Sequence, residues 1–321
     1  MPDDPYPTSQ YVLWAYRLLL GREPEDPTAV EAYPETSRLA IVDRFISSPE
    51  FRANALGDVR PPDRRYMVEL DNGLRFWLLS GDQYVSPAIA TGDYESVETA
   101  FVRRYVNRGM AAVDVGANLG WFVVHLALLV GTEGRVDAFE PRADLMDLLT
   151  KTIGENGLTN VTTHNFALGS QNYYGQMVWS VHDVNPGGTN LVSSDFVAPD
   201  TTAQPVAVRT LDACISHRVD FIKLDVEGSE LLVLKGAERI LAKDRPLILV
   251  EINPSNLTRT SGVSATGFGK FVQSLDYCLY DIAGDGSCGR QILSSELAAI
   301  QTLVNVAMLP KERAEAAGTN L

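Results

Sequence analysis

The sequence has few of the residues that build disulfide frameworks and metal centres. It contains three cysteines and four histidines in 321 residues, and it has no C-x-x-C pair. An odd number of cysteines without metal-ligand spacing argues against a zinc site and fits free thiols in a reducing compartment. We therefore expect a protein without structural disulfides.

Long apolar runs are also missing. The longest candidate, Trp121–Val130, is shorter than the roughly 20 residues of a membrane-spanning helix and includes His125. The N-terminal MPDDPYPTSQ is acidic and rich in proline, unlike a secretory signal. These two absences predict no membrane span and a cytoplasmic location.

Positive charge is scarce. The chain has 27 lysines and arginines against 41 acidic residues, a formal net charge of −14. Such a surface repels phosphate backbones, which argues against nucleic acid as a partner. The hydrophobic share of 45% is ordinary for a globular protein, and the length is sufficient for one or two domains.

Residues 1–60 are predicted to be a separate helical region. SQYVLWAYRLLLG places Val12, Tyr16 and Leu19 on one helical face, and TSRLAIVDRFISSPEF repeats the pattern after a proline-rich span. This region is expected to pack on the main domain or to bind a partner. Pro61 and Pro62 mark the boundary to a second domain, residues 61–321.

The second domain is predicted to be α/β. YMVELDNGLRFWLL predicts a β-hairpin around Asn72-Gly73, and a helix follows it within residues 64–107. Over residues 110–310 strands and helices alternate, which predicts a parallel, doubly wound sheet. An irregular insert is expected at about 169–205. The last two apolar runs, YCLYDI and VNVAMLP, fit an antiparallel closing pair.

The segment VDVGANLGWF predicts a ligand-binding turn between a strand and a helix. Gly116 and Gly120 permit a ligand to approach the backbone closely. The G-x-G-x-x-G motif of a dinucleotide site is absent, because Asn118 stands where that motif has its middle glycine. Asp114 repels a pyrophosphate and attracts an ammonium group. Glu140, at the end of the next strand, is placed to accept ribose hydroxyls. This combination favours S-adenosylmethionine as the ligand.

A second acidic group follows two later strands. FIKLDVEGSE contains Asp225 and Glu227, and LILVEIN ends near Glu251. Carboxylates beside apolar strands are costly to bury unless they are paired. They are therefore either functional or paired with Lys223.

Several segments together resemble the FkbM family of S-adenosylmethionine-dependent methyltransferases. They are GDYESVETAFVRRYVNRGMAAVDVGANLGWFVVHLA, AFEP, NFALGS, VRTLDACI, FIKLDVEGSELLVLKGAERIL and LILVEIN, in family order over about Gly92–Asn253. The resemblance implies a class I methyltransferase fold, a Rossmann-like sheet of seven strands with a reversed last strand. It also implies O-methylation of sugar hydroxyls or of polyketide-type natural products.

The resemblance also implies roles for individual residues. Those expected near the methionine part of the cofactor are Asp114, Gly116, Asn118 and Gly120. Glu140 is expected at the ribose, and Asn165, Phe166 and Ala167 near the adenine. Asp225 and Glu227 are expected to face the methyl group and the acceptor. In the N-terminal region, the LLGR and SPEF motifs resemble a small bacterial helical domain of unassigned function, associated with cell-surface glycans.

The base that activates the acceptor is left open by the sequence. Asp225 and Glu227 are the first candidates, and His182 in the insert is the second because imidazole titrates near neutral pH. Asp183 and Asn190 are candidates for binding acceptor hydroxyls. Asp225 and Glu251 could instead supply oxygen ligands to Mg²⁺.

Two other classes of function compete with a methyltransferase. A nicotinamide-dependent oxidoreductase predicts the missing G-x-G-x-x-G. A non-catalytic glycan- or partner-binding protein predicts damaged cofactor positions, whereas Asp114, Gly116, Glu140 and Asp225 are all present. The INPSN segment only faintly resembles the N-P-P-Y of nucleic-acid amino-methyltransferases. The identity of the acceptor and the oligomeric state are not predicted.

Overall fold

The computed structural model describes residues 8–19, 23–24, 30, 41, 44–45, 65–180, 190–192 and 201–316. The chain divides into two compact units, Met1–Arg64 and Arg65–Leu321. In the first unit, α1 (Thr8–Leu19) contributes the apolar face predicted from its spacing, with Val12 fully buried and Tyr16 edge-to-face with Phe45 at 4.9 Å. Most of the second predicted helix lies outside the described residues.

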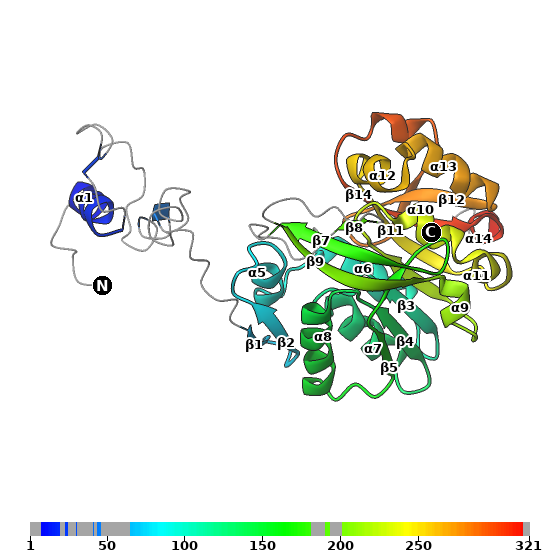
Figure 1. The fold of residues 1–321 in the computed structure, drawn as a ribbon, viewed down its shortest axis with the longest axis horizontal. Helices are drawn as coiled ribbons and strands as arrows, with labels where there is room; N and C mark the ends of the chain where they lie inside the picture. Colours follow the sequence, from blue (N-terminus) through cyan, green and yellow to red (C-terminus); the bar gives the residue numbers. More distant parts are fainter. Residues whose placement is uncertain are drawn as a thin grey trace. The chain divides into compact units, whose positions relative to one another are not determined.

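An eight-stranded sheet forms the centre of the second unit (Figure 1). Its order is β13-β12-β14-β11-β10-β3-β4-β5. The strand bounds are β3 (Ala111–Val115), β4 (Arg135–Phe139), β5 (Val161–His164), β10 (Phe221–Leu224), β11 (Leu247–Ile252), β12 (Tyr277–Ile282), β13 (Cys288–Ile292) and β14 (Val304–Pro310).

Strand directions confirm the predicted doubly wound sheet with a reversed last strand. From β5 to β11 neighbouring strands are parallel, whereas β14 is antiparallel to both β11 and β12. The edge strand β13 was not predicted. Its three central residues are exposed and polar or glycine, so the segment lacks the apolar run that identifies a buried strand.

Helices cover both faces of the sheet because its central strands are apolar on both sides. One face packs against α6 (Ser96–Tyr105), α7 (Trp121–Val130) and α8 (Ala143–Glu155). The other packs against α9 (Leu211–Cys214), α10 (Glu230–Lys235), α11 (Glu238–Lys243), α12 (Pro254–Ser261) and α13 (Ala265–Ser274). Short elements α5 (Val85–Ala90), η1 (Glu296–Ala299) and α14 (Lys311–Ala316) complete the helices described.

The sequence of Ser229–Ala242 predicts a single helix, and this prediction is wrong. The segment forms α10 and α11, two helices separated by a short break. The carboxylate of Asp212 accepts hydrogen bonds from the backbone N–H groups of Arg239 (2.7 Å) and Ile240 (3.1 Å). A remote side chain thus caps the start of α11, which local spacing does not reveal.

The predicted hairpin is present as β1 (Arg65–Glu69) and β2 (Arg75–Leu79), which are antiparallel. In the turn, Asn72 accepts a hydrogen bond from the backbone of Leu74 through its side chain. The hairpin lies beside α8, and α5 and α6 then lead the chain into β3 (Figure 1).

The described parts of the insert form regular strands, contrary to expectation. They build a second sheet of order β6-β9-β7-β8, from β6 (Ala167–Leu168), β7 (Tyr173–Ser180), β8 (Asn190–Val192) and β9 (Thr201–Arg209). The segment VTTHNFAL predicts one continuous strand. The structure interrupts it at Asn165 and Phe166, where the chain passes from β5 in the first sheet to β6 in the second.

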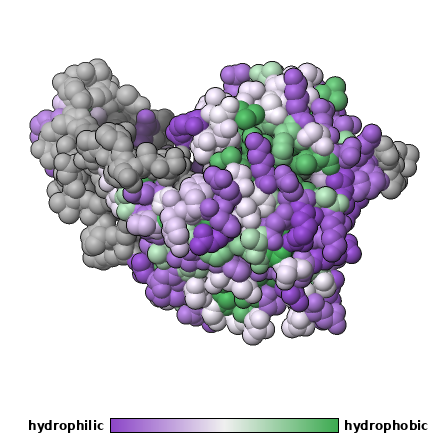
Figure 2. Space-filling model, turned by 45° about the vertical axis from the view of Figure 1, so that its right-hand side comes forward, coloured by the Kyte–Doolittle hydropathy of each residue, from purple (hydrophilic) through white to green (hydrophobic). Residues whose placement is uncertain are grey.

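The visible surface of the described residues in Figure 2 is mostly hydrophilic, with small hydrophobic areas between. The few large apolar side chains exposed on the described residues are Met67, Tyr84, Leu128, Tyr174, Leu293 and Leu303. Within the described residues, no helix combines the length and apolar character that a membrane crossing requires.

Candidate active site

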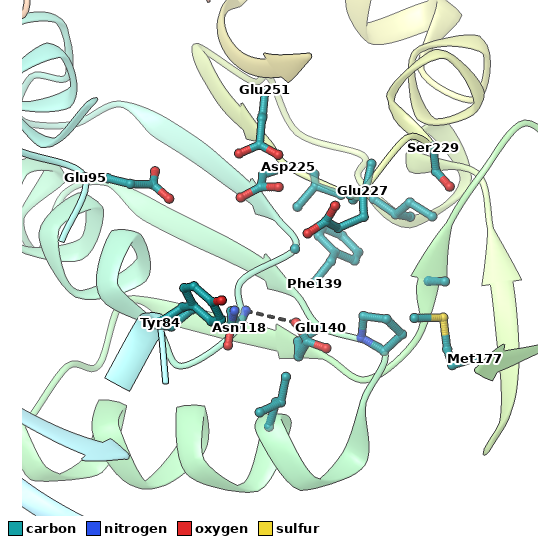
Figure 3. Close-up of a pocket in the computed structure, with 18 of the residues that line it drawn as sticks. Tyr84, Glu95, Asn118, Phe139, Glu140, Met177, Asp225, Glu227, Ser229 and Glu251 are labelled. Atoms are coloured by element: carbon teal, nitrogen blue, oxygen red, sulfur yellow. Dashed lines mark hydrogen bonds between the residues drawn. The ribbon is translucent and has the colours of Figure 1, made fainter. Parts of the chain in front are cut away.

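A cavity of about 370 Å³ lies at the carboxyl ends of β3, β4, β10 and β11 (Figure 3). The last residues of these strands and those that follow them line it, among them Val115, Phe139, Asp225 and Glu251. Ligands of open α/β sheets bind at this edge, so the topology and the cavity indicate the same place.

The turn between β3 and α7 forms part of the cavity wall through Gly116 and Asn118. Gly116 has φ +87°, and a Cβ there would lie 1.8 Å from the carbonyl oxygen of Asp225. The chain that approaches Gly116 closely is therefore the backbone of Asp225, directly after the neighbouring strand β10. Gly120 has φ +91° and faces Leu149 of α8, and it does not line the cavity. Both glycines shape the turn that presents Asn118.

Asn118 and Glu140 are joined across the turn. The backbone N–H of Asn118 donates to Glu140 Oε2 at 2.9 Å, and the backbone N–H of Arg142 donates to Oε1 at 2.9 Å. The Asn118 Oδ1 atom is buried and has no partner within the described residues. An orphaned buried acceptor is the state expected of a group that a ligand completes.

Glu140 is 5% exposed, and its carboxylate lines the cavity. Burial raises its pKa to about 7, while the two backbone donors act in the opposite direction and favour the charged form. Each carboxylate oxygen keeps a lone pair for a further donor. Glu140 therefore has the position and the acceptor capacity expected for a ribose-binding carboxylate.

An apolar wall continues from Glu140. Phe139 and Phe166 meet edge-to-face with centroids 5.6 Å apart, and Ala167, Leu168 and Met177 of the second sheet extend the wall. Two of the three residues expected near an adenine thus line the cavity. The third, Asn165, does not; its amide donates to the backbone oxygens of Glu140 (2.8 Å) and Pro141 (3.2 Å) and fixes the loop.

Lys223 pairs with Asp225, which is the second of the two outcomes considered for these carboxylates. Its Nζ lies 2.8 Å from Asp225 Oδ2 and 4.7 Å from the ring centroid of Phe122. Burial alone would lower the pKa of Lys223, but Asp225, Glu95 and Asp114 outweigh it and raise the pKa. The ammonium group is therefore charged at neutral pH, and Asp225 still lines the cavity.

Three further carboxylates gather near Asp225 (Figure 3): Glu95, Glu227 and Glu251. Glu227 Oε2 accepts a hydrogen bond from Asn256 Nδ2 at 2.7 Å. Burial and then Asp225 raise the pKa of Glu227 to about 7 and that of Glu251 to about 9. The cavity thus has an acidic end opposite the end formed by Glu140.

Asp114 is the one predicted carboxylate that the structure places outside the cavity wall. It lies on β3 beside Lys223 on β10 and is 1% exposed. Burial raises its pKa to about 7, and its Oδ1 atom has no hydrogen-bond partner among the described residues. Asp114 thus lies within β3, two residues before the glycine turn, and not in the cavity wall.

The predicted candidates in the insert cannot be compared with the cavity. His182 and Asp183 lie outside the described residues, and only the backbone of Asn190 is described, in β8. Within the described part of the chain, no group of three or more His, Cys, Asp or Glu side chains is arranged to hold a metal ion. The Mg²⁺ hypothesis for Asp225 and Glu251 therefore gains no support.

Sequence reasoning missed the contribution of the segment before α6. Tyr84, Tyr94 and Glu95 line the cavity, and Glu95 adopts a left-handed backbone conformation with φ 45° at the start of α6. An acidic residue just before a helix gives no signal of this geometry. The available clue was that Glu95 lies in a segment that resembles the FkbM family.

Comparison with known proteins places this site in a family. Residues 114–282 match the methyltransferase FkbM domain, more than half of the chain. The hexuronic acid methyltransferase AglP of Haloferax volcanii is 29% identical over 150 residues, a match that covers 46% of this chain. The match spans only 59% of that relative's length.

Solved structures of methyltransferases are also similar, at low identity. A methyltransferase FkbM from Methylobacillus flagellatus is 16% identical with a TM-score of 0.41, covering 92% of this chain and 58% of its own. A SAM-dependent O-methyltransferase from Thermotoga maritima is 15% identical with a TM-score of 0.38, covering 76% and 77%. At these scores the fold assignment rests on the strand order itself. The family match covers β4, β10, β11 and the end of β3, and the chain belongs to the FkbM methyltransferase family.

Proposed function

We propose that the protein is an S-adenosylmethionine-dependent O-methyltransferase that acts on a hydroxyl of a sugar or glycan. One observation carries the proposal: a single cavity holds a backbone-anchored carboxylate, Glu140, at one end and the carboxylates of Asp225 and Glu227 at the other. The first end suits the donor and the second suits an acceptor hydroxyl.

At the donor end, the carboxylate of Glu140 accepts hydrogen bonds from the ribose hydroxyls. Phe139 and Phe166 contact the adenine. The orphaned Oδ1 of Asn118 accepts a hydrogen bond from the amino-acid part of the donor. Asp114 is 1% exposed, so it acts on the donor through its charge and does not contact it. Bound S-adenosylmethionine supplies an activated methyl group, so the protein has mainly to position the acceptor.

At the acidic end, Glu227 takes the proton of the acceptor hydroxyl. Its pKa of about 7 suits a general base at neutral pH. Asp225, held by Lys223, orients the hydroxyl. As the proton passes to Glu227, the hydroxyl oxygen bonds to the methyl carbon and the carbon–sulfur bond breaks, leaving a methyl ether and S-adenosylhomocysteine.

The sugar class of the acceptor is supported by the name of the relative from Haloferax volcanii, a hexuronic acid methyltransferase. A polyketide-type hydroxyl remains the second candidate acceptor because the family resemblance includes it. The three cysteines, Cys214, Cys278 and Cys288, form no disulfide, which fits a reducing compartment, so the cytoplasm is the proposed location.

Calorimetry followed by methyl transfer tests the proposal. We expect the purified protein to bind S-adenosylmethionine and not NAD, and to transfer a ¹³C-labelled methyl group to a glycan as an O–CH₃ ether visible by NMR. Failure to bind the donor favours a non-catalytic glycan-binding protein. A label on nitrogen, or in an ester, contradicts O-methylation of a hydroxyl.

A further inference from the structure

The cavity has carboxylates and no basic side chain among the described residues that line it. Five of these lining residues are acidic: Glu95, Glu140, Asp225, Glu227 and Glu251. Residues 181–200 of the insert, most of which lie outside the described residues, add no lysine or arginine to the sequence near the cavity wall. They contain three aspartates and one histidine. A carboxylate-bearing acceptor would meet like charge here.

Lys223 does not offset this charge for a ligand. It is 5% exposed, does not line the cavity, and is bound to Asp225 and the ring of Phe122. Its one positive charge is therefore used inside the protein. Glu95, Glu227 and Glu251 remain without a lysine or arginine ion pair among the described residues.

Glu251 is the most exceptional of the group. It is 9% exposed, lines the cavity, and accepts no hydrogen bond from any described residue. Figure 3 shows its carboxyl group directed toward Asp225, with Glu227 nearby. A cavity-lining carboxyl group beside other carboxylates is costly to ionise, and a cationic ligand group removes that cost. Burial and repulsion by Asp225 raise the pKa of Glu251 by more than the charge of Lys223 lowers it.

We propose that the acceptor carries an ammonium group close to the hydroxyl that is methylated, as an amino sugar does, and that Glu251 binds this group. This inference rests on the proposed function and narrows its substrate class. Glu227, beside Glu251, then faces the neighbouring hydroxyl. The donor's ammonium is bound at the opposite end, near Asn118, and does not need Glu251.

Matched sugars bound to the protein loaded with S-adenosylhomocysteine test the proposal. The probes are the methyl glycosides of glucosamine, N-acetylglucosamine, glucose and glucuronic acid, titrated by calorimetry. We expect glucosamine to bind about 10-fold or more tightly than the two neutral sugars, the size of one charge-assisted hydrogen bond, and glucuronic acid to bind weakest.

Glu251→Gln keeps the shape of the side chain and removes its ability to ionise when a cationic ligand binds. We expect it to abolish the preference for glucosamine over N-acetylglucosamine while the affinity for S-adenosylmethionine stays within about 2-fold, below a lost hydrogen bond. Glu133→Gln, at a surface position 73% exposed, is the control that should keep the preference.

Three results overturn the proposal: tightest binding of glucuronic acid, equal binding of all four sugars including none at all, or a Glu251→Gln variant that loses donor affinity with the sugar preference intact. Donor affinity is measured first on the same protein. Loss of donor binding in the parent protein refutes the proposed function, whereas intact donor binding with the wrong sugar preference refutes only this inference.

Discussion

Glu140 and Glu251 follow or end parallel strands of one sheet and line one cavity, yet their surroundings differ. Glu140 accepts two backbone hydrogen bonds, and its pKa is about 7. Glu251 accepts none from the described residues, lies near Asp225, and has a pKa of about 9. Both are buried, so the difference comes from hydrogen bonds and neighbouring charge rather than from burial.

This contrast teaches how the cavity divides its work. The backbone around Glu140 holds a charged acceptor in place before any ligand arrives, which reduces the cost of ordering the site. The acidic end instead concentrates carboxylates around one internal cation, Lys223, and depends on a ligand to balance them. The following experiments test whether the two ends act separately.

The largest expected effect is at the acidic end. Glu227→Gln should lower kcat by about 10²-fold or more, the usual contribution of a general base, with donor affinity nearly unchanged. Single-turnover kinetics and calorimetry measure the two quantities. Glu238→Gln on the exposed surface of α11 is the control. A parallel loss of donor affinity would show that the ends are not separate.

The next effect is at the donor end. Glu140→Gln should weaken S-adenosylmethionine binding by about 10- to 100-fold, because an amide replaces one oxygen that accepts hydrogen bonds from the backbone and the ribose. Calorimetry gives the dissociation constant. Glu155→Gln, exposed at the end of α8, should bind normally. Unchanged affinity in Glu140→Gln would remove Glu140 from the donor site.

A smaller effect concerns pH and stability. Glu251 has an ordinary pKa of 4.5 and a folded pKa of about 9, so the folded state holds a proton that the unfolded chain releases. Its favourable contribution is full below about pH 4.5 and is lost as the pH rises toward 9. The groups that set this pKa besides burial are Asp225, Lys223, Glu227 and Glu95.

Glu251→Gln does not titrate. Its Tm relative to that of the parent protein should therefore rise steadily between about pH 5 and pH 9, as thermal unfolding at several pH values would show. Glu155→Gln, at an exposed position, is the control variant. Parallel curves for Glu251→Gln and the parent would mean that Glu251 ionises normally in the folded protein.

The smallest expected effect is that of metal removal. EDTA should leave turnover unchanged, because the described residues provide no group of three metal-ligating side chains and Lys223 already pairs with Asp225. The assay compares turnover before and after chelation. Lost turnover that returns with Mg²⁺ would restore Asp225 and Glu251 as candidate metal ligands.

Much of the fold follows from local sequence patterns. Apolar runs of four to six residues, such as LILVEI, form the central strands, and Asn72-Gly73 forms the hairpin turn. The reversed last strand came from the family resemblance and is confirmed by β14. The acidic residues after these strands, Glu140 and Asp225, line the cavity because parallel strands end at one edge.

The features that were missed depend on contacts between distant residues. Asp114 could not be placed outside the cavity wall without knowing that β10 pairs with β3. The start of α11 is capped by Asp212, more than 20 residues away. Glu95 reaches the cavity through a left-handed backbone that no spacing predicts.

The way the second sheet joins the core makes it a segment that could be exchanged between related methyltransferases. It leaves the core at β6 and returns to it after β9, and these two strands are paired, with the backbone N–H of Gly169 donating to the carbonyl of Arg209 at 2.9 Å. A segment whose ends lie side by side can be replaced as a unit without separating its attachment points. It also carries Met177 into the cavity wall. Chimeras that swap residues 170–207 would thus transplant one wall of the pocket while leaving Glu140 and Asp225 in their own framework.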